Sequence, residues 1–181
     1  GEFDNPGSVA LVGSRVYVLD RGNRRVQIFD GVTLQPEAFA FGSEQLKEPL
    51  AILVDDPSDP TVTVDVVDLE AGELYLQRFQ LNQEIKAKDG KRTVLLSTTG
   101  QQRSKLGKAS SGAVSMVRDS GNARYWVIQS GNFWEIDESG KGTAFSLPNL
   151  PTFANSTAVG MYACGKANRG YLIIADSSSR T

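Results

Sequence analysis

Three arginines lie close together in the polar segment DRGNRR, at positions 21, 24 and 25. A guanidinium group presents parallel N–H donors that match the oxygens of a phosphate. This chemistry makes Arg21 and Arg24 candidates for binding a phosphate ester. For Arg25 the sequence favours a structural role at the edge of a sheet, because Arg180 follows a similar strand and polar turn later in the chain.

A group of acidic residues alternates with apolar residues in the segment TVTVDVVDLE: Asp65, Asp68 and Glu70. Carboxylate oxygens are the ligands that Ca²⁺ prefers in proteins. We therefore treat the three as candidate calcium ligands, and the alternative is that they form the polar face of a strand. The acids of VDDPSDP (55, 56 and 59) could form a calcium loop, but Asp and Pro are standard turn residues, which favours a polar turn.

Two features of the composition exclude whole classes of chemistry. The 181 residues include no histidine and one cysteine, Cys164. Ser-His-Asp and Cys-His catalysis, histidine-ligated zinc, an internal disulfide and a thiolate metal cluster are therefore excluded. The net charge of -2 gives no reason to expect a nucleic-acid partner. No apolar run approaches the roughly 20 residues of a membrane span.

A two-stranded unit recurs along the chain. Residues 15–30, RVYVLDRGNRRVQIFD, contain two apolar strands around an Asp-led turn, and YLIIADSSSRT, residues 171–181, repeats the first half. Such a unit is typical of an antiparallel hairpin, and its recurrence indicates a repeat architecture. We expect four successive groups of strands, which we call passes. The first pass contains strands at 9–12, 15–19, 26–29 and 38–41, and the second contains strands at 50–54, 61–67, 74–81 and 93–97. The third contains strands at 113–117, 124–128, 133–136 and 143–147, and the fourth contains strands at 159–163 and 171–175.

Passes of three or four short strands joined by turns are typical of the blades of a β-propeller. The sequence thus predicts an all-β fold: a single β-propeller domain, or part of one, over residues 1–181, with about three and a half blades. An open arc would expose strand edges, so we expect missing strands to come from a longer segment or another chain. The polar segment 83–110 is expected to be an insertion between blades, a solvated loop with one outer strand at 93–97.

The first 30 residues resemble an NHL-type repeat. The positions that carry the resemblance are Phe3, Pro6, Asp20, Gly22, Asn23, Arg25, Gln27 and Phe29. The match covers one blade.

From about residue 14 onward, the order of the blades also resembles the β-propeller phytases. The segments that carry this resemblance are DRGN, LEAGELYLQRFQLN, NARYWVIQSGNFWEI and GMYACGKANRGYLIIADSSS. The resemblance implies a six-bladed propeller that hydrolyses phosphomonoesters of inositol phosphates with calcium as cofactor. We also expect a secreted or periplasmic location.

The phytase pattern carries over to this chain only in part. Arg21 matches a phosphate-contacting arginine of the family, and Glu70 matches an acidic residue, but Leu69 stands where the family has lysine. Neutral residues occupy three positions where the family has glutamate: Ser111, Gln129 and the range 156–158.

Two functional hypotheses follow. The first is a degenerate or accessory phytase-like domain that binds inositol phosphates or related esters and hydrolyses them only if its metal site is completed. The second is a non-catalytic NHL-like propeller whose top face binds a protein or a glycan.

Overall fold

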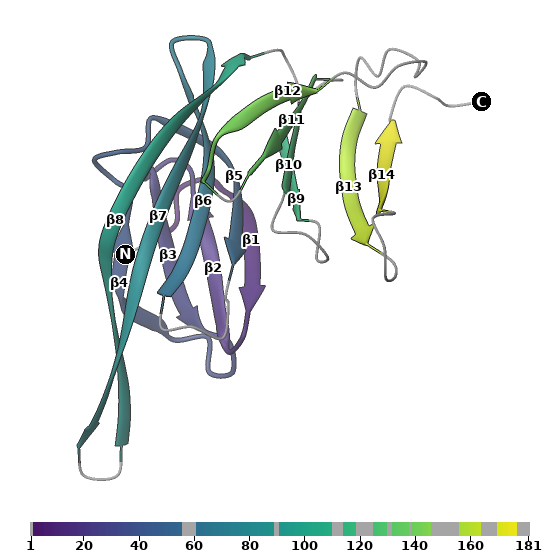
Figure 1. The fold of residues 1–181 in the computed structure, drawn as a ribbon. Helices are drawn as coiled ribbons and strands as arrows, with labels where there is room; N and C mark the ends of the chain where they lie inside the picture. The colour runs from purple at the N-terminus through teal and green to yellow at the C-terminus, as the bar shows by residue number, and fades with distance from the viewer. Residues whose placement is uncertain are drawn as a thin grey trace. The chain divides into compact units, whose positions relative to one another are not determined.

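The computed structural model describes residues 2–55, 61–88, 91–109, 114–118, 125–129, 132–137, 139–145, 156–163 and 170–176. Over these ranges the backbone consists of strands, turns and short connections, without a helix. No helix able to cross a membrane therefore occurs in the described ranges. The predicted all-β class is confirmed, and Figure 1 shows the strands grouped into separate sheets.

Sheet 1 is an antiparallel meander of β1 (Pro6–Val12), β2 (Arg15–Asp20), β3 (Arg25–Asp30) and β4 (Pro36–Phe41). Alternating side chains of a strand point to opposite faces, and both faces of this sheet are rich in β-branched and aromatic residues, which favour pleated structure. The pairing of β1 with β2 is irregular at Gly7, between the pairs Pro6–Asp20 and Ser8–Leu19.

Sheet 2 contains β5 (Glu48–Asp55), β6 (Thr61–Glu70), β7 (Glu73–Lys88) and β8 (Lys91–Lys108), in that order. A two-residue turn joins β6 to β7. Its central residues, Ala71 and Gly72, have φ values of 51° and 80°. Positive φ at both positions is the signature of a type I′ turn, whose twist suits a hairpin.

The segment 83–110 is mostly strand, because β7 and β8 extend through it. The expectation of a loop with one short strand was wrong in this respect. Its polar composition has another physical cause: β8 lies at the edge of sheet 2, and most side chains from Ser97 to Arg103 are exposed. Polar residues on an edge strand also discourage pairing with other chains. Its place between blades stays a prediction.

Two further sheets follow. Sheet 3 is the antiparallel meander β9 (Val114–Arg118), β10 (Tyr125–Gln129), β11 (Asn132–Ile136) and β12 (Gly142–Phe145), and sheet 4 is the pair β13 (Ser156–Ala163) and β14 (Gly170–Asp176). Every strand predicted from the sequence overlaps one of the strands found. Parts of three predicted strands (113, 124 and 146–147) lie outside the described residues. The predicted grouping of the strands into four successive sets agrees with the four sheets of the described ranges, and the assignment of these sheets to propeller blades stays a prediction.

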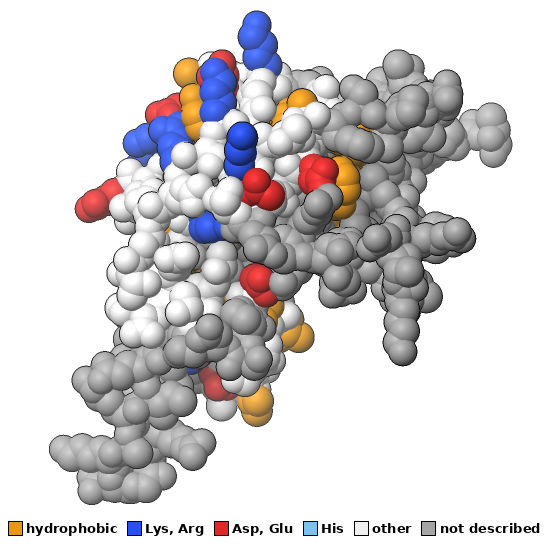
Figure 2. Space-filling view, in the orientation of Figure 1, with side chains coloured by type: hydrophobic (Ala, Val, Ile, Leu, Met, Phe, Trp, Pro, Cys, Tyr) orange, Lys and Arg blue, Asp and Glu red, His pale blue; other side chains and the backbone are white. Residues whose placement is uncertain are grey.

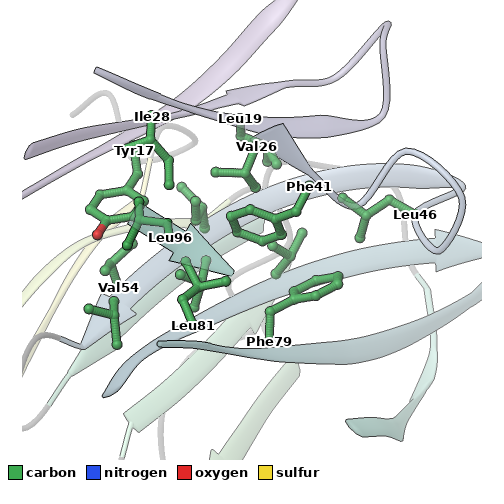
Figure 3. Packing of buried hydrophobic residues seen from close by; sticks show 14 residues of the cluster. Tyr17, Leu19, Val26, Ile28, Phe41, Leu46, Val54, Phe79, Leu81 and Leu96 are labelled. Carbon is green, nitrogen blue, oxygen red and sulfur yellow. The ribbon is translucent and has the colours of Figure 1, made fainter. Parts of the chain in front are cut away.

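The main hydrophobic core lies between sheets 1 and 2 (Figure 3). The rings of Phe41 and Phe79 meet at its centre, with centroids 5.0 Å apart and planes inclined at 59°. The buried members of this core are Tyr17, Leu19, Val26, Ile28, Phe41, Leu46, Ile52, Val54, Val62, Val64, Val66, Phe79, Leu81 and Leu96.

The chain divides into two compact units. One comprises Gly1–Asp68 and Gln77–Arg103, and the other comprises Leu69–Leu76 and Ser104–Thr181. In the first unit, β1 lies beside β5; in the second, β9 lies beside β13. In each unit, therefore, the first strand of one sheet is a neighbour of the first strand of the next sheet.

Candidate functional site

The carboxylate of Asp20, at the end of β2, is the centre of a hydrogen-bond network. Its Oδ1 accepts from the backbone N–H of Asp4 at 2.8 Å. Its Oδ2 accepts from Asn23 Nδ2, Arg25 Nε and Gln27 Nε2, each at 2.9 Å. The side chain is fully buried. A carboxylate in this position joins the turn after β2, the strand β3 and the segment that precedes β1.

The electrostatic state of Asp20 follows from these donors. Burial alone would raise its pKa, because it disfavours the charged form. The hydrogen bonds from Asp4, Asn23, Arg25 and Gln27 outweigh burial and lower the pKa of Asp20 below its ordinary value of 3.8. Asp20 is therefore a stably ionised structural group.

The NHL-like motif residues are thus engaged in holding the fold together. Besides Asp20, both Asn23 Nδ2 and Arg25 Nη2 donate to the backbone carbonyl of Glu2, at 3.2 Å each. The rings of Phe3 and Phe29 lie 5.5 Å apart between centroids. These contacts agree with the structural role that the sequence favours for Arg25.

The two candidate phosphate-binding arginines have different environments. Arg21 donates from Nε to the backbone carbonyl of Pro49 in β5 at 2.9 Å. Its aliphatic stem packs on Gly7, where an added Cβ would collide with it. Arg21 therefore links the β2–β3 turn to sheet 2. Arg24 is exposed and has a φ of 54°, and its backbone N–H donates to the carbonyl of Arg21 at 3.1 Å.

Asp68, one of the candidate calcium ligands, is fully buried near the end of β6. Its Oδ1 accepts from the backbone N–H groups of Lys47 at 3.0 Å and Glu48 at 2.8 Å. Burial raises the pKa of Asp68, although hydrogen bonds from Lys47, Glu48 and Gln77 and the positive charge of Arg103 act in the opposite direction. The carboxyl group therefore holds the start of β5.

Asp65 forms a buried ion pair with Arg78 of β7. Arg78 Nε lies 2.9 Å from Oδ1 and Arg78 Nη2 lies 3.0 Å from Oδ2 of Asp65, so both carboxylate oxygens accept from one guanidinium group. Side-chain exposure is 5% for Asp65 and 11% for Arg78. Each buried charge is neutralised by the other, and the pair spans the β6–β7 hairpin.

The candidate calcium ligands do not form one site. Val62, Val64 and Val66 face the core, and by the two-residue period of a strand Asp68 lies on their face whereas Asp65 lies on the opposite one. Glu70 is half-buried and already engaged in an interaction. In the described ranges, no three acidic or cysteine side chains are grouped so that they could hold a metal ion. Asp55 ends β5, and residues 56 and 59 lie outside the described ranges.

The structure reveals a repeated feature that the sequence prediction missed. Asp20 and Asp68 both lie at or near the end of the second strand of a sheet, and both accept from backbone N–H groups just before or at the start of the first strand. In both sheets a buried glutamine of the third strand, Gln27 or Gln77, adds a hydrogen bond. We call this arrangement the Asp latch. The shared spacing V-x-V-x-D (16–20 and 64–68) is the signal that could have identified it.

Related residues occupy the same place in the other two sheets. β10 of sheet 3 ends in Gln129, which is buried. β14 of sheet 4 ends in Asp176, whose backbone pairs with Ser156 at the start of β13, just as Asp20 pairs with Pro6. In the described ranges, a polar residue therefore ends the second strand of sheets 3 and 4 as well, a glutamine in sheet 3 and an aspartate in sheet 4.

Charged side chains of both signs lie among one another on the visible surface (Figure 2). The structure also contains an ion pair between Glu73 and Lys105, with Nζ 2.6 Å from Oε2. The hydrogen bond from Lys105 lowers the pKa of Glu73, and the same bond raises the pKa of Lys105. Exposed pairs of this kind add little to stability.

The comparisons with known proteins give no family assignment. No protein-family model matches this chain, and no curated protein matches its sequence. The phytase and NHL resemblances therefore stay hypotheses that depend on the residues quoted above.

Proposed function

We propose that this chain is a non-catalytic binding module, built from successive sheets as part of a β-propeller, that presents its strand-connecting turns to a protein or glycan. One observation carries the proposal: the Asp latch recurs in sheets 1 and 2 with the same kinds of partner, the backbone segment at the start of the first strand and a buried glutamine of the third strand. A repeated unit with a repeated internal contact is what a propeller requires of its blades.

The neighbours of the first strands support the propeller arrangement. In a propeller, each sheet runs outward from a central channel, so the innermost strands of consecutive blades lie next to one another. The adjacency of β1 to β5 in one unit and of β9 to β13 in the other fits this arrangement. The hydrogen bond from Arg21 to the carbonyl of Pro49 connects the β2–β3 turn of sheet 1 to the first strand of sheet 2.

The contacts of the candidate ligands support a non-catalytic role. Asp65 is neutralised by Arg78, Asp68 accepts from backbone amides, and Arg21 donates to a backbone carbonyl. A calcium site needs six to eight oxygen ligands and compensating negative charge. Recruiting Asp65 or Asp68 to such a site would leave a buried donor without its acceptor, which costs stability.

The experiment that tests this proposal measures calcium dependence in two ways. A ligand that binds the folded state raises the melting temperature, so we expect no difference in Tm between calcium and a chelator. We also expect no phosphate release from phytate in either condition. A calcium-dependent rise in Tm together with phosphate release that stops on chelation would refute the non-catalytic proposal and restore the phytase hypothesis.

A second candidate function, phosphate-ester binding without hydrolysis, is favoured by one observation at Arg24. A non-glycine residue with φ of 54° is held in a conformation that costs about 1–3 kcal/mol, and such strain clusters at ligand sites. The side chain is exposed, and the backbone N–H of Arg24 donates to the carbonyl of Arg21 in the same turn. We propose Arg24 as the contact to the ester and Arg21 as the residue that fixes the turn.

Calorimetric titration with phytate separates this second candidate from a purely structural role. Arg24→Gly removes the guanidinium and also relieves the strained φ, so it should abolish phytate binding while raising the stability of the protein. Arg25→Gln is the matched control, because it should lower stability without a specific effect on binding. Unchanged phytate affinity in Arg24→Gly, or no binding by the unmodified chain, would rule out the phosphate site.

A further inference from the structure

We infer that the β2–β3 turn, with the residues at its two ends (20–25), is a binding site for an extended peptide segment of a partner protein. Residues 2–5 of this chain occupy the site as an internal ligand, and we call them the N-terminal strap. The inference rests on the proposed function and deepens it, because it names the class of partner and the turn that binds it. The strap and the turn both belong to the first compact unit.

Asp4 of the strap gives both of its backbone groups to the turn. Its N–H donates to Asp20 Oδ1 at 2.8 Å, and its carbonyl accepts from the N–H of Gly22 at 2.8 Å. A Cβ added to Gly22 would collide with the side chain of Asp4, so the close approach of the two segments requires glycine. Every residue except proline offers one N–H and one carbonyl. These two bonds therefore select an extended backbone, as many peptide-binding sites do.

The strap makes a second polar contact and an apolar one. The carbonyl of Glu2 accepts from Asn23 Nδ2 and from Arg25 Nη2, at 3.2 Å each. The ring of Phe3 packs on that of Phe29, with centroids 5.5 Å apart and planes inclined at 39°. Aromatic pairs of this kind add attraction beyond the area that they bury. The ligand class is therefore an extended segment in which an aromatic residue lies between two residues bound through their backbone.

The donors of the site are held in place by contacts that do not involve the strap. Asn23 Nδ2, Arg25 Nε and Gln27 Nε2 each donate to Asp20 Oδ2 at 2.9 Å. These bonds are retained when the strap leaves, so the site stays formed. Binding to preorganised groups avoids the cost of ordering them. A segment from another protein thus meets the same site that the strap occupies.

The junction between the strap and β1 is strained, which favours replacement of the strap. Asn5 has a φ of 51°, and Pro6 follows it at the start of β1. A residue before proline favours an extended conformation with φ near about −120°. A positive φ also costs free energy in a residue that has a Cβ. A separate peptide carries no such strained junction, so it forms the same contacts at a lower conformational cost.

Amide hydrogen exchange in the full chain, followed by NMR, tests whether a peptide replaces the strap. The probe is the peptide GEFDNP, which copies residues 1–6 and is blocked at both ends. Replacement deprives the N–H of Asp4 of its acceptor, whereas the N–H of Gly22 bonds to the peptide instead. We therefore expect added peptide to speed exchange at Asp4 and to slow it at Gly22. Exchange at Leu19, in the middle of sheet 1, reports global unfolding.

The concentration of peptide that is needed tests the competition. A tethered segment competes at an effective concentration in the mM range, so the peptide is titrated to about 10 mM. Phe3→Ala in the chain weakens the strap and leaves the turn intact. In this variant the peptide should therefore act at a concentration about tenfold lower.

Peptide variants test the individual contacts. N-methylation of the aspartate that copies Asp4 removes the donor to Asp20, and we expect it to weaken binding at least about tenfold. Alanine in place of the glutamate is the matched control, because Glu2 contributes its backbone carbonyl to the turn. This peptide should bind as the unmodified one does.

Three outcomes would overturn the inference. In the first, Asp4, Gly22 and Leu19 exchange at one rate that the peptide leaves unchanged, so that the strap opens only on global unfolding. In the second, the peptide slows exchange at Asp4 and Gly22 together, so that it does not replace the strap. In the third, the N-methylated peptide binds as well as the unmodified one. Failure of the proposed function is distinct, because it would appear as calcium-dependent phosphate release.

Discussion

Asp20 and Asp68 occupy equivalent positions in sheets 1 and 2, yet their pKa values move in opposite directions. Both carboxyl groups are fully buried, and both hold the start of a neighbouring strand. In sheet 1, hydrogen bonds that include the guanidinium of Arg25 overcome burial and lower the pKa. In sheet 2, burial outweighs hydrogen bonds from Lys47, Glu48 and Gln77, and the pKa is raised.

The difference arises from the turn that follows each aspartate. The turn after Asp20 runs from Arg21 to Arg24, so that Arg25 begins β3 directly opposite Asp20. The hairpin after Asp68 turns at Ala71 and Gly72. A charge-assisted hydrogen bond is stronger than one from a neutral amide. One structural role is therefore filled by two carboxyl groups whose pKa values are shifted in opposite directions.

The largest effect that separates the two latches is expected for Asp20→Ala. This change leaves the buried amide of Gln27, the half-buried guanidinium of Arg25 and the backbone N–H of Asp4 without the Asp20 acceptor. We expect a loss of about 3–5 kcal/mol in the free energy of unfolding, because several hydrogen bonds to one charged group are lost together. Urea denaturation measures it. Asp68→Ala should lower the free energy of unfolding by a smaller amount, because the hydrogen bonds that Asp68 accepts come from backbone N–H groups and the neutral amide of Gln77. An equal loss in the two variants would contradict the distinction between the latches.

A second comparison uses two first-strand residues, Ile52 of β5 and Val9 of β1, which are 6% and 63% exposed. Ile52→Ser places a hydroxyl in the core and removes apolar contacts, so we expect it to lower the free energy of unfolding by about 2–4 kcal/mol. Val9→Ser should change it by less than about 0.5 kcal/mol. Similar losses in both variants, measured by urea denaturation, would mean that the chain itself covers β1.

The two aspartates should also give opposite dependences of stability on pH. The stabilisation from Asp20 is present above its unfolded pKa, near 3.8, and is lost as pH falls toward its lower folded pKa. The folded protein binds the proton of Asp68 more tightly than the unfolded chain does. Its contribution therefore increases as pH falls toward 3.8 and is lost as pH rises through the raised folded pKa.

Asn variants isolate these two contributions in melting curves measured from pH 3 to pH 7. Asp20→Asn should remove part of the loss of stability below about pH 4. Asp68→Asn should remove an increase in stability that the unmodified protein shows on mild acidification. If both variants changed the stability at low pH in the same direction, the assignment of opposite pKa shifts to Asp20 and Asp68 would be wrong.

The smallest expected effect concerns the shorter turn. Ala71 has a φ of 51°, a conformation that glycine adopts without steric cost. Ala71→Gly should therefore raise the free energy of unfolding by about 0.5–1 kcal/mol, despite the greater flexibility of the unfolded chain. Gly72→Ala is the control: an added Cβ at Gly72 meets no atom within 4 Å, so only the φ of 80° opposes it. A loss of stability in Ala71→Gly would contradict this account of the turn.

Local sequence patterns predicted the strands well, because alternation and Asp-led turns are local signals. They predicted the polar segment 83–110 poorly, since composition does not separate a solvated loop from the exposed edge strand β8. The candidate site was the least predictable part. Asp65 and Asp68 are near in sequence, but their opposite faces and the partners Arg78, Lys47 and Glu48 depend on pairing between distant segments.

Residue types and the two-residue period of a strand were sufficient to predict the all-β class, the order of the strands in the described ranges and their grouping into hairpin-connected sheets. The absence of histidine chemistry follows from composition alone. Contacts between strands far apart in the chain determine which charges are neutralised internally, because these contacts set the burial and the partners of each side chain. The same contacts leave Ile52 and Val54 of β5 covered and Val9 and Leu11 of β1 exposed. Exposure depends on the neighbouring sheet, which no local pattern encodes.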